Sequence, residues 1–275
     1  MNWAWSERTP VMPHKHISRS PWFHILPAIL LMWVTVSTHG AEARIAVASN
    51  FRNTALAIAE YLETNSSHRY QIISGSTGKL ASQIINGAPF DIFMAADQQR
   101  PRELESLGLA VPGSVIPYAL GELGLWWPDA PNALNVAQLA ELPAGQVCIA
   151  NPAFAPYGEA AMTILKAAPL DADWLGGLVR VDNINLVTAW VAAGQARAGF
   201  VARSAMIAAQ RKGEAVVVPD EVMWLNEHPP IAQAMAVMKR AGENPAAAFW
   251  VRQLRSAPVQ AMLVRDGYRV PQVIE

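Results

Sequence analysis

The chain has 275 residues, of which 52% are hydrophobic and 16% are charged, and its formal net charge is −1. This length allows one large domain or two modest ones, and the near-neutral charge gives no indication of a nucleic-acid partner or a basic membrane-binding surface. The single cysteine, Cys148, lies in an apolar run and cannot form a disulfide within the chain. We therefore interpret it as a buried structural thiol.

The N-terminal segment is typical of a secretory signal peptide. Basic residues precede a charge-free stretch over residues 20–41, and Ala41-Glu42-Ala43 has the small-x-small pattern of a signal-peptidase site. We predict that residues 1–43 are removed and that the mature protein lies in the periplasm. A retained membrane anchor is the alternative, but the apolar core is short for a spanning helix and contains Pro27.

The first half of the mature chain alternates apolar strands with amphipathic helices. Helical spacing of apolar residues follows each of the first two strands, and a third helix is expected over residues 99–107. The predicted strands are residues 45–48, 70–73 and 90–96. This βαβαβα order predicts a parallel sheet with right-handed crossovers. Residues 114–127 are extended and contain Gly121 and Gly124, which suits a crossing between two lobes.

The second half of the chain repeats this α/β pattern. Strands are predicted at residues 146–150, 178–181, 198–201 and 215–218. Helical patterns follow the first two of these strands. An extended segment over residues 231–239 and two helices, over residues 245–254 and 258–264, then close the chain. The fold class is therefore α/β.

Small polar residues follow the ends of strands in both halves. They lie at residues 49–50, 74–78, 151–158 and 182–185. A helix start presents free backbone N–H groups and the positive end of the macrodipole, and ligands of open α/β sheets bind where such loops lie. The alternative is that these residues are only helix N-caps. Two such loops in each half favour a binding site for a small anion.

Four motifs of this chain also occur, in the same order, in a known family. They are Ala48-Ser49-Asn50-Phe51, Ser74-Gly75-Ser76-Thr77-Gly78, Gly87-Ala88-Pro89-Phe90-Asp91 and Asn151-Pro152 with Ala155-Pro156-Tyr157-Gly158. Over essentially the whole mature chain, the sequence resembles the periplasmic molybdate-binding (ModA) family of bacterial ABC importers. The resemblance implies a two-lobed type II periplasmic binding protein. Each lobe would be a mainly parallel sheet flanked by helices, and crossing hinge strands would join the lobes. We expect residues 44–122 and 226–275 to form lobe 1 and residues 123–225 to form lobe 2.

In this family neutral groups hold the oxyanion, and the matching positions imply a ligand-binding set here. The set comprises Ser49 and Asn50 from the first loop, Thr77 from the second, and the backbone N–H groups of Tyr157 and Ile184. Some members add a tyrosine hydroxyl after the Gly-x-Val strand. Here that position is Ala202, so we expect Asn50 to substitute. These residues would bind molybdenum only as the oxyanion. We expect no cofactor and no catalytic residue.

The resemblance implies a monomer that captures molybdate, and tungstate, and delivers it to an inner-membrane ABC permease. Sulfate is an alternative ligand, because it has the same charge and shape as molybdate but is smaller. A secreted enzyme is a more distant alternative. No Gly-x-Ser-x-Gly elbow surrounds Ser49, and no histidine of the mature region lies in a recognisable partner motif. We therefore predict that the protein is not an enzyme.

Two charged residues lie beside the predicted anion loops. We interpret Asp182 as a helix N-cap whose carboxylate faces the backbone rather than the anion. Lys79 follows a glycine-rich run, but the spacing does not match a P-loop. We therefore interpret Lys79 as a solvated helix lysine.

Overall fold

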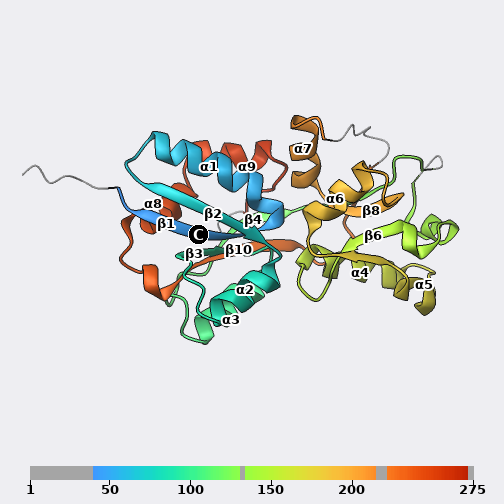
Figure 1. The fold of residues 1–275 in the computed structure, drawn as a ribbon, viewed down its shortest axis with the longest axis horizontal. Helices are drawn as coiled ribbons and strands as arrows, with labels where there is room; N and C mark the ends of the chain where they lie inside the picture. The colour runs from blue at the N-terminus through green and yellow to red at the C-terminus, as the bar shows by residue number, and fades with distance from the viewer. Residues whose placement is uncertain (1–39, 131–133, 215–221, 272–275) are drawn as a thin grey trace, which may run out of the picture. The chain divides into compact units, whose positions relative to one another are not determined.

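The computed structural model describes residues 40–130, 134–214 and 222–271. These residues form two five-stranded sheets with helices packed on them (Figure 1). The strand orders are β2-β1-β3-β10-β4 and β7-β6-β8-β5-β9. We call the first sheet with its helices lobe 1 and the second sheet with its helices lobe 2.

Lobe 1 is built around the central strand β1. Its strands are β1 (Glu42–Ala48), β2 (Arg69–Gly75), β3 (Ile92–Met94), β4 (Ile116–Gly121) and β10 (Ile231–Val237). Strand β1 pairs in parallel with β2 and β3, whereas β10 pairs antiparallel with β3 and β4. Four strands therefore run in one direction and β10 runs in the other. Its helical segments are η1 (Ser49–Phe51), α1 (Arg52–Thr64), α2 (Thr77–Ile85), α3 (Gln99–Ser106), η5 (Lys239–Ala241), α8 (Pro245–Gln253) and α9 (Ala257–Arg265).

The two faces of the first sheet have separate apolar cores, because successive side chains of a strand point to opposite faces. Ala43, Ile45 and Val47 of β1 pack in the core that contains α1, α8 and α9. Ala46 packs with residues of α2 and α3 in the other core. Figure 1 shows α1 and α2 on opposite sides of the sheet. Because α1 and α2 pack on the sheet, they hold in place the loops that connect them to β1 and β2.

Lobe 2 has the same arrangement of strand directions. Its strands are β5 (Leu123–Trp126), β6 (Val147–Ala150), β7 (Val179–Val181), β8 (Ala198–Ala202) and β9 (Val222–Leu225). Strand β5 runs antiparallel to β8 and β9, and β6 pairs in parallel with β7 and β8. Its helical segments are η2 (Val136–Glu141), η3 (Ala144–Gln146), α4 (Pro156–Ala167), α5 (Ala172–Gly176), α6 (Ile184–Ala192) and α7 (Arg203–Arg211). Cys148 is buried in this lobe, and burial raises its pKa to about 12, as expected of a structural thiol.

The chain crosses between the sheets twice, and each crossing supplies the strand that runs against its neighbours. Strand β4 ends at Gly121 and β5 begins at Leu123 in the other sheet, so the predicted extended run over residues 114–127 is two strands. The second crossing leads from β9 to β10. A Cβ atom at Gly121 would overlap the hydroxyl of Tyr157, so this crossing requires glycine.

The predicted α/β class and the two lobes with mainly parallel sheets are confirmed. Strand β1 begins at Glu42, so the predicted cleavage after Ala43 falls inside it. Residues 1–39 of the predicted signal peptide and the predicted strand at residues 215–218 lie outside the described residues. The exact lobe boundaries stay a prediction.

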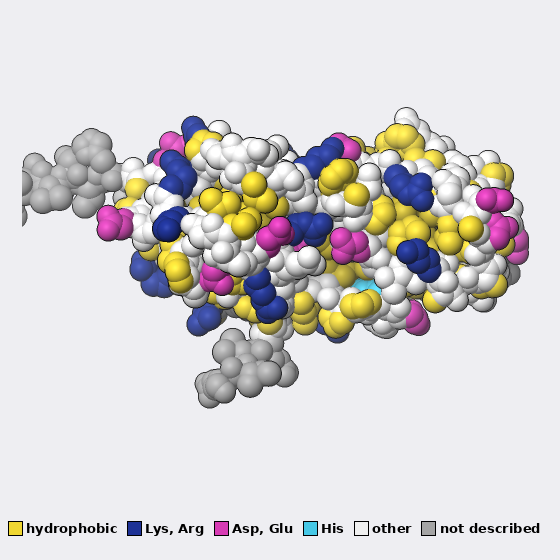
Figure 2. Space-filling view, turned by 90° about the horizontal axis from the view of Figure 1, so that it is seen from below, with side chains coloured by type: hydrophobic (Ala, Val, Ile, Leu, Met, Phe, Trp, Pro, Cys, Tyr) yellow, Lys and Arg dark blue, Asp and Glu magenta, His cyan; other side chains and the backbone are white. Residues whose placement is uncertain are grey.

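Two further features are the mixture of side chains on the surface and the length and polarity of the helices. On the face shown in Figure 2, basic and acidic side chains are interspersed with apolar and neutral ones. Among the described residues, every helix is too short or too polar to cross a membrane.

Candidate anion-binding site

All five residues predicted to bind the anion line one small cavity. Its volume is about 10 Å³, which is roughly the space that one water molecule requires. The walls are Ala48, Ser49, Asn50, Ser76, Thr77, Ala96, Ala155, Pro156, Tyr157 and Ile184. None of these lining residues, all of which belong to the described part of the chain, has a charged side chain. A tetrahedral oxyanion is larger than one water, so the walls must move apart to admit it.

Lobe 1 contributes two helix starts to this cavity. Ser49 and Asn50 open η1 directly after β1, where backbone N–H groups have no acceptor within the helix. Thr77 opens α2, and its side chain is almost fully buried. The Thr77 hydroxyl accepts a hydrogen bond from the N–H of Ala96 at 3.1 Å, which leaves its proton to be donated. The bond therefore orients this hydroxyl as a donor.

Lobe 2 contributes two further helix starts. Pro156 is the first residue of α4 and lacks an N–H, so the N–H of Tyr157 is the first that this helix presents. Ile184 is the first residue of α6. The N-cap side chain of Asn183 accepts from the two N–H groups that follow Ile184, and the N–H of Ile184 is left out of this cap. Both N–H groups lie at the positive end of a helix macrodipole, which favours an anion.

The side chain of Asn50 lines the cavity and is hydrogen-bonded to other buried polar groups, and its role as an anion ligand stays a prediction. Its Nδ2 donates to Oε1 of Gln233 at 3.0 Å and to the hydroxyl of Tyr268 at 3.1 Å. The Asn50 carbonyl in turn accepts from Tyr268 at 2.8 Å and from Ser204 at 3.2 Å. The amide donors of Asn50 are therefore engaged in holding its own loop.

A buried polar network lies beneath the cavity. Gln233 is fully buried, accepts a hydrogen bond from the Tyr118 hydroxyl at 2.9 Å and donates to the Tyr157 hydroxyl at 3.4 Å. Burial raises the pKa of Tyr118, Tyr157 and Tyr268 above the ordinary value of a tyrosine. These hydroxyls therefore stay protonated at neutral pH, and the floor of the site is uncharged.

Contacts between the lobes surround the cavity. Asn185 Nδ2 donates to the carbonyl of Ser49 at 2.7 Å, and Lys79 Nζ lies 2.6 Å from Asp182 Oδ2. The interpretation of Asp182 as the N-cap of α6 is wrong, because Asn183 occupies that position. Lys79 likewise is not simply solvated, since it is half-exposed and paired with Asp182. Asp182 is thus paired with a lysine that is distant in sequence, and neither residue lines the cavity.

Sequence reasoning missed Ser76 as a member of the site. Ser76 is 4% exposed and lines the cavity beside Thr77. Among the described residues, its Oγ has no hydrogen-bond partner. The run Ser74-Gly75-Ser76-Thr77 carried the signal, because it places two hydroxyls side by side at the start of a helix.

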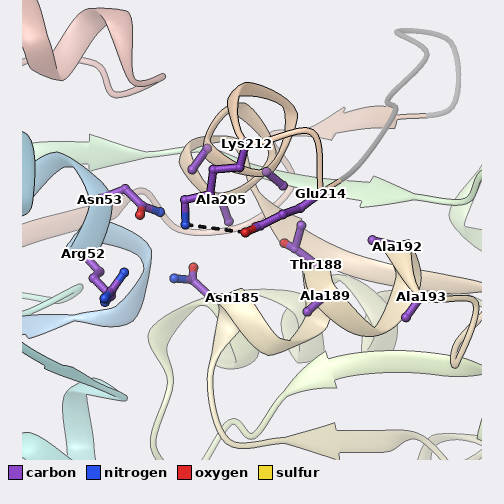
Figure 3. A pocket seen from close by; sticks show the side chains of 12 residues that line it. Arg52, Asn53, Asn185, Thr188, Ala189, Ala192, Ala193, Ala205, Lys212 and Glu214 are labelled. Carbon is purple, nitrogen blue, oxygen red and sulfur yellow. Dashed lines mark ion pairs between the residues drawn. The ribbon is translucent and has the colours of Figure 1, made fainter.

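A larger hollow of about 380 Å³ lies elsewhere, between the start of α1 and the helices α6 and α7 (Figure 3). Many of its lining side chains are alanine methyls. Lys212 and Glu214 face each other in it, 3.8 Å apart. This hollow is lined by Arg52, Lys212 and Glu214, so it is not made of neutral donors. We assign the anion to the smaller cavity, because all five predicted ligands line it and none of them lines the hollow. Within the described ranges, no cluster of three or more His, Cys, Asp or Glu could hold a bare metal ion.

Similarity to known proteins shows the family to which this chain belongs. The chain matches the family model of the bacterial extracellular solute-binding proteins over residues 43–269. The molybdate-binding protein ModA of Azotobacter vinelandii is 34% identical over 236 residues, with 84% of this chain and 91% of that protein covered. ModA of Rhodobacter capsulatus is 30% identical over 239 residues, with 87% and 92% covered. The chain belongs to the ModA family of bacterial extracellular solute-binding proteins.

The fold agrees with this assignment. The solved structure of the periplasmic molybdate-binding protein of Azotobacter vinelandii superposes with a TM-score of 0.74 at 28% identity. The match covers 84% of this chain and all of that one. The family that the sequence motifs indicated is therefore confirmed.

Proposed function

We propose that the protein binds molybdate in the cavity at the starts of η1, α2, α4 and α6 and delivers it to an ABC importer. It is a binding protein rather than an enzyme, as its ModA relatives are. The observation that carries this proposal is the lining itself. Neutral donors from both lobes converge on one cavity that no charged side chain among the described residues lines.

Neutral donors suit a small dianion. Each hydrogen bond to a charged acceptor contributes about 1.5–3 kcal/mol net, so a handful of them supports tight binding. The helix starts add the favourable ends of their macrodipoles without placing a counter-charge in the site. A carboxylate in the lining would repel a dianion, and none of the described residues that line the cavity carries one.

The same lining supports discrimination against phosphate. Phosphate at neutral pH retains a proton, which needs an acceptor. Among neutral donors that proton is left unpaired, at a cost of about 1–3 kcal/mol. Molybdate and tungstate carry no proton at neutral pH, so both fit the site.

Delivery follows from the contacts between the lobes. Residues of both lobes line the cavity, and Asn185 of lobe 2 binds the Ser49 carbonyl of lobe 1, so we infer that movement of the lobes admits and releases the anion. We infer that the mature protein works in the periplasm as a monomer. There the closed and open forms would be distinguished by an inner-membrane permease.

Sulfate is the second candidate ligand, because it is smaller than molybdate. A volume of about 10 Å³ demands less widening for sulfate than for molybdate. Sulfate has the same charge and shape, so the number of donors does not separate the two anions. Cavity radius in the bound form decides between them.

Thermal unfolding and calorimetry of the mature protein with molybdate, tungstate, sulfate and phosphate test the proposal. We expect molybdate and tungstate to raise the unfolding temperature strongly and phosphate to leave it almost unchanged. Preference for sulfate over molybdate would assign the protein to the second candidate. Equal stabilisation by phosphate would contradict a site made of neutral donors.

A further inference from the structure

We propose that Ser76 is a further ligand of the anion, a side-chain donor from lobe 1 that lies next to Thr77. This inference rests on the proposed oxyanion-binding function and extends its set of ligands. It starts from the hydroxyl itself. Ser76 is 4% exposed, and within the described part of the chain its Oγ is buried without a hydrogen-bond partner. Burial of a hydroxyl without a partner is unfavourable, so such a group in a binding cavity calls for an explanation.

Helix capping does not supply that explanation. Ser76 is the N-cap of α2 and has the extended backbone of a capping residue, with φ −69° and ψ 142°. Serine at this position ordinarily accepts a hydrogen bond from an N–H of the first turn. The Ser76 side chain makes no such bond to any described residue. Asn183, the N-cap of α6, does cap its helix in this way.

The position of Ser76 supplies the explanation instead. Ser76 lines the cavity together with Ser49 and Thr77. The hydroxyl of Thr77 is oriented as a donor by the N–H of Ala96, whereas the hydroxyl of Ser76 is free to rotate. A free hydroxyl at the positive end of α2 donates to an anion oxygen without breaking any bond. The anion is therefore the missing partner of Ser76.

This role predicts that loss of the Ser76 hydroxyl affects molybdate affinity but not the stability of the ligand-free protein. Removal of the hydroxyl takes a donor from the anion but takes no hydrogen bond from the ligand-free protein. Ser76→Ala should therefore weaken molybdate binding about 10- to 100-fold, the factor expected for one hydrogen bond to a charged acceptor. The unfolding temperature of ligand-free Ser76→Ala should be no lower than that of the wild type.

Ser256 offers a matched control. It is the N-cap of α9, its side chain makes no cap bond, and its Oγ is also buried with no partner among the described residues. Ser256 does not line the cavity. Ser256→Ala therefore makes the same chemical change at the same kind of position, and it should leave molybdate affinity unchanged. Ser76→Gly is a second variant at the site, because glycine is well tolerated at an N-cap.

The test is calorimetric titration of molybdate into the wild type and these three variants, with thermal unfolding of each ligand-free protein. Weak binding by both Ser76 variants, with normal ligand-free unfolding and a normal Ser256→Ala, supports the inference. Wild-type affinity in Ser76→Ala overturns it, although binding by the wild-type protein would still uphold the proposed function. A marked loss of ligand-free stability in both Ser76 variants would also overturn it, because the hydroxyl would then be structural. Absence of molybdate binding by the wild type would overturn both proposals.

Discussion

Thr77 is the donor whose contribution the structure allows us to work out in most detail. Its hydroxyl accepts the N–H of Ala96 at 3.1 Å and keeps its proton for the anion. Thr77→Ala removes one hydrogen bond to a charged acceptor, which should weaken molybdate binding by about 1.5–3 kcal/mol. It also leaves the buried N–H of Ala96 without that acceptor. The free energy of unfolding of the ligand-free protein should therefore fall by about 1–3 kcal/mol.

Calorimetry and urea unfolding measure these two effects separately. Thr77→Ser keeps the hydroxyl and should restore most of the affinity. Thr188 is a matched control, since it is buried in α6 and its Oγ1 has no partner among the described residues. Thr188→Ala should cost only the burial of a methyl group, about 1 kcal/mol, and should not change the affinity. If Thr77→Ala and Thr188→Ala bind molybdate equally well, the reasoning about Thr77 is refuted.

Three further predictions follow from neighbouring side chains. Asn50→Ala should lower the free energy of unfolding by about 1–3 kcal/mol, because it removes a buried bond to Gln233; urea unfolding of the ligand-free protein checks this. Lys79→Ala should change the affinity by less than about 1 kcal/mol, because its pair with Asp182 is largely exposed; titrations at low and high salt measure it, and a loss as large as that of Thr77→Ala would indicate a basic clamp. Burial acts to raise the pKa of Asp266, but hydrogen bonds from two arginines and a threonine outweigh it and hold that pKa below its usual range. The stabilisation by Asp266 is therefore present above the unfolded-state pKa of about 4 and lost as the pH falls through the lower folded-state value. Unfolding at stepped pH should show this loss in the wild type and a flatter profile in Asp266→Asn.

The elements and loops of the site could be predicted because they depend on local chemistry. Strand β1 alternates side chains between two cores, and the small polar residues after it and after β2 open helices. Helix α7 was not predicted. It begins directly after β8, and its N-cap is Ala202, so no capping residue or polar loop marks its start.

The connections within the site could not be predicted, because they join residues that are distant in sequence. Asn50 and Gln233 are 183 residues apart, and Lys79 and Asp182 are 103 residues apart. A single sequence shows each as an ordinary polar or charged residue. Only the fold shows that Gln233 engages the donors of Asn50 and that Lys79 neutralises Asp182. The same applies to Ser76, which looks like an ordinary N-cap until its hydroxyl is found without a bond.

The central claim is that neutral groups of both lobes hold one oxyanion. A crystal structure of the mature protein with molybdate tests it most directly, because the anomalous scattering of molybdenum locates the metal without assumptions about the ligand. We expect one molybdenum peak in the cavity, with its oxygens within hydrogen-bond distance of the Thr77 hydroxyl and of the N–H groups of Tyr157 and Ile184. A peak in the hollow that Lys212 and Glu214 line, or an oxyanion held by a charged side chain, would contradict the account.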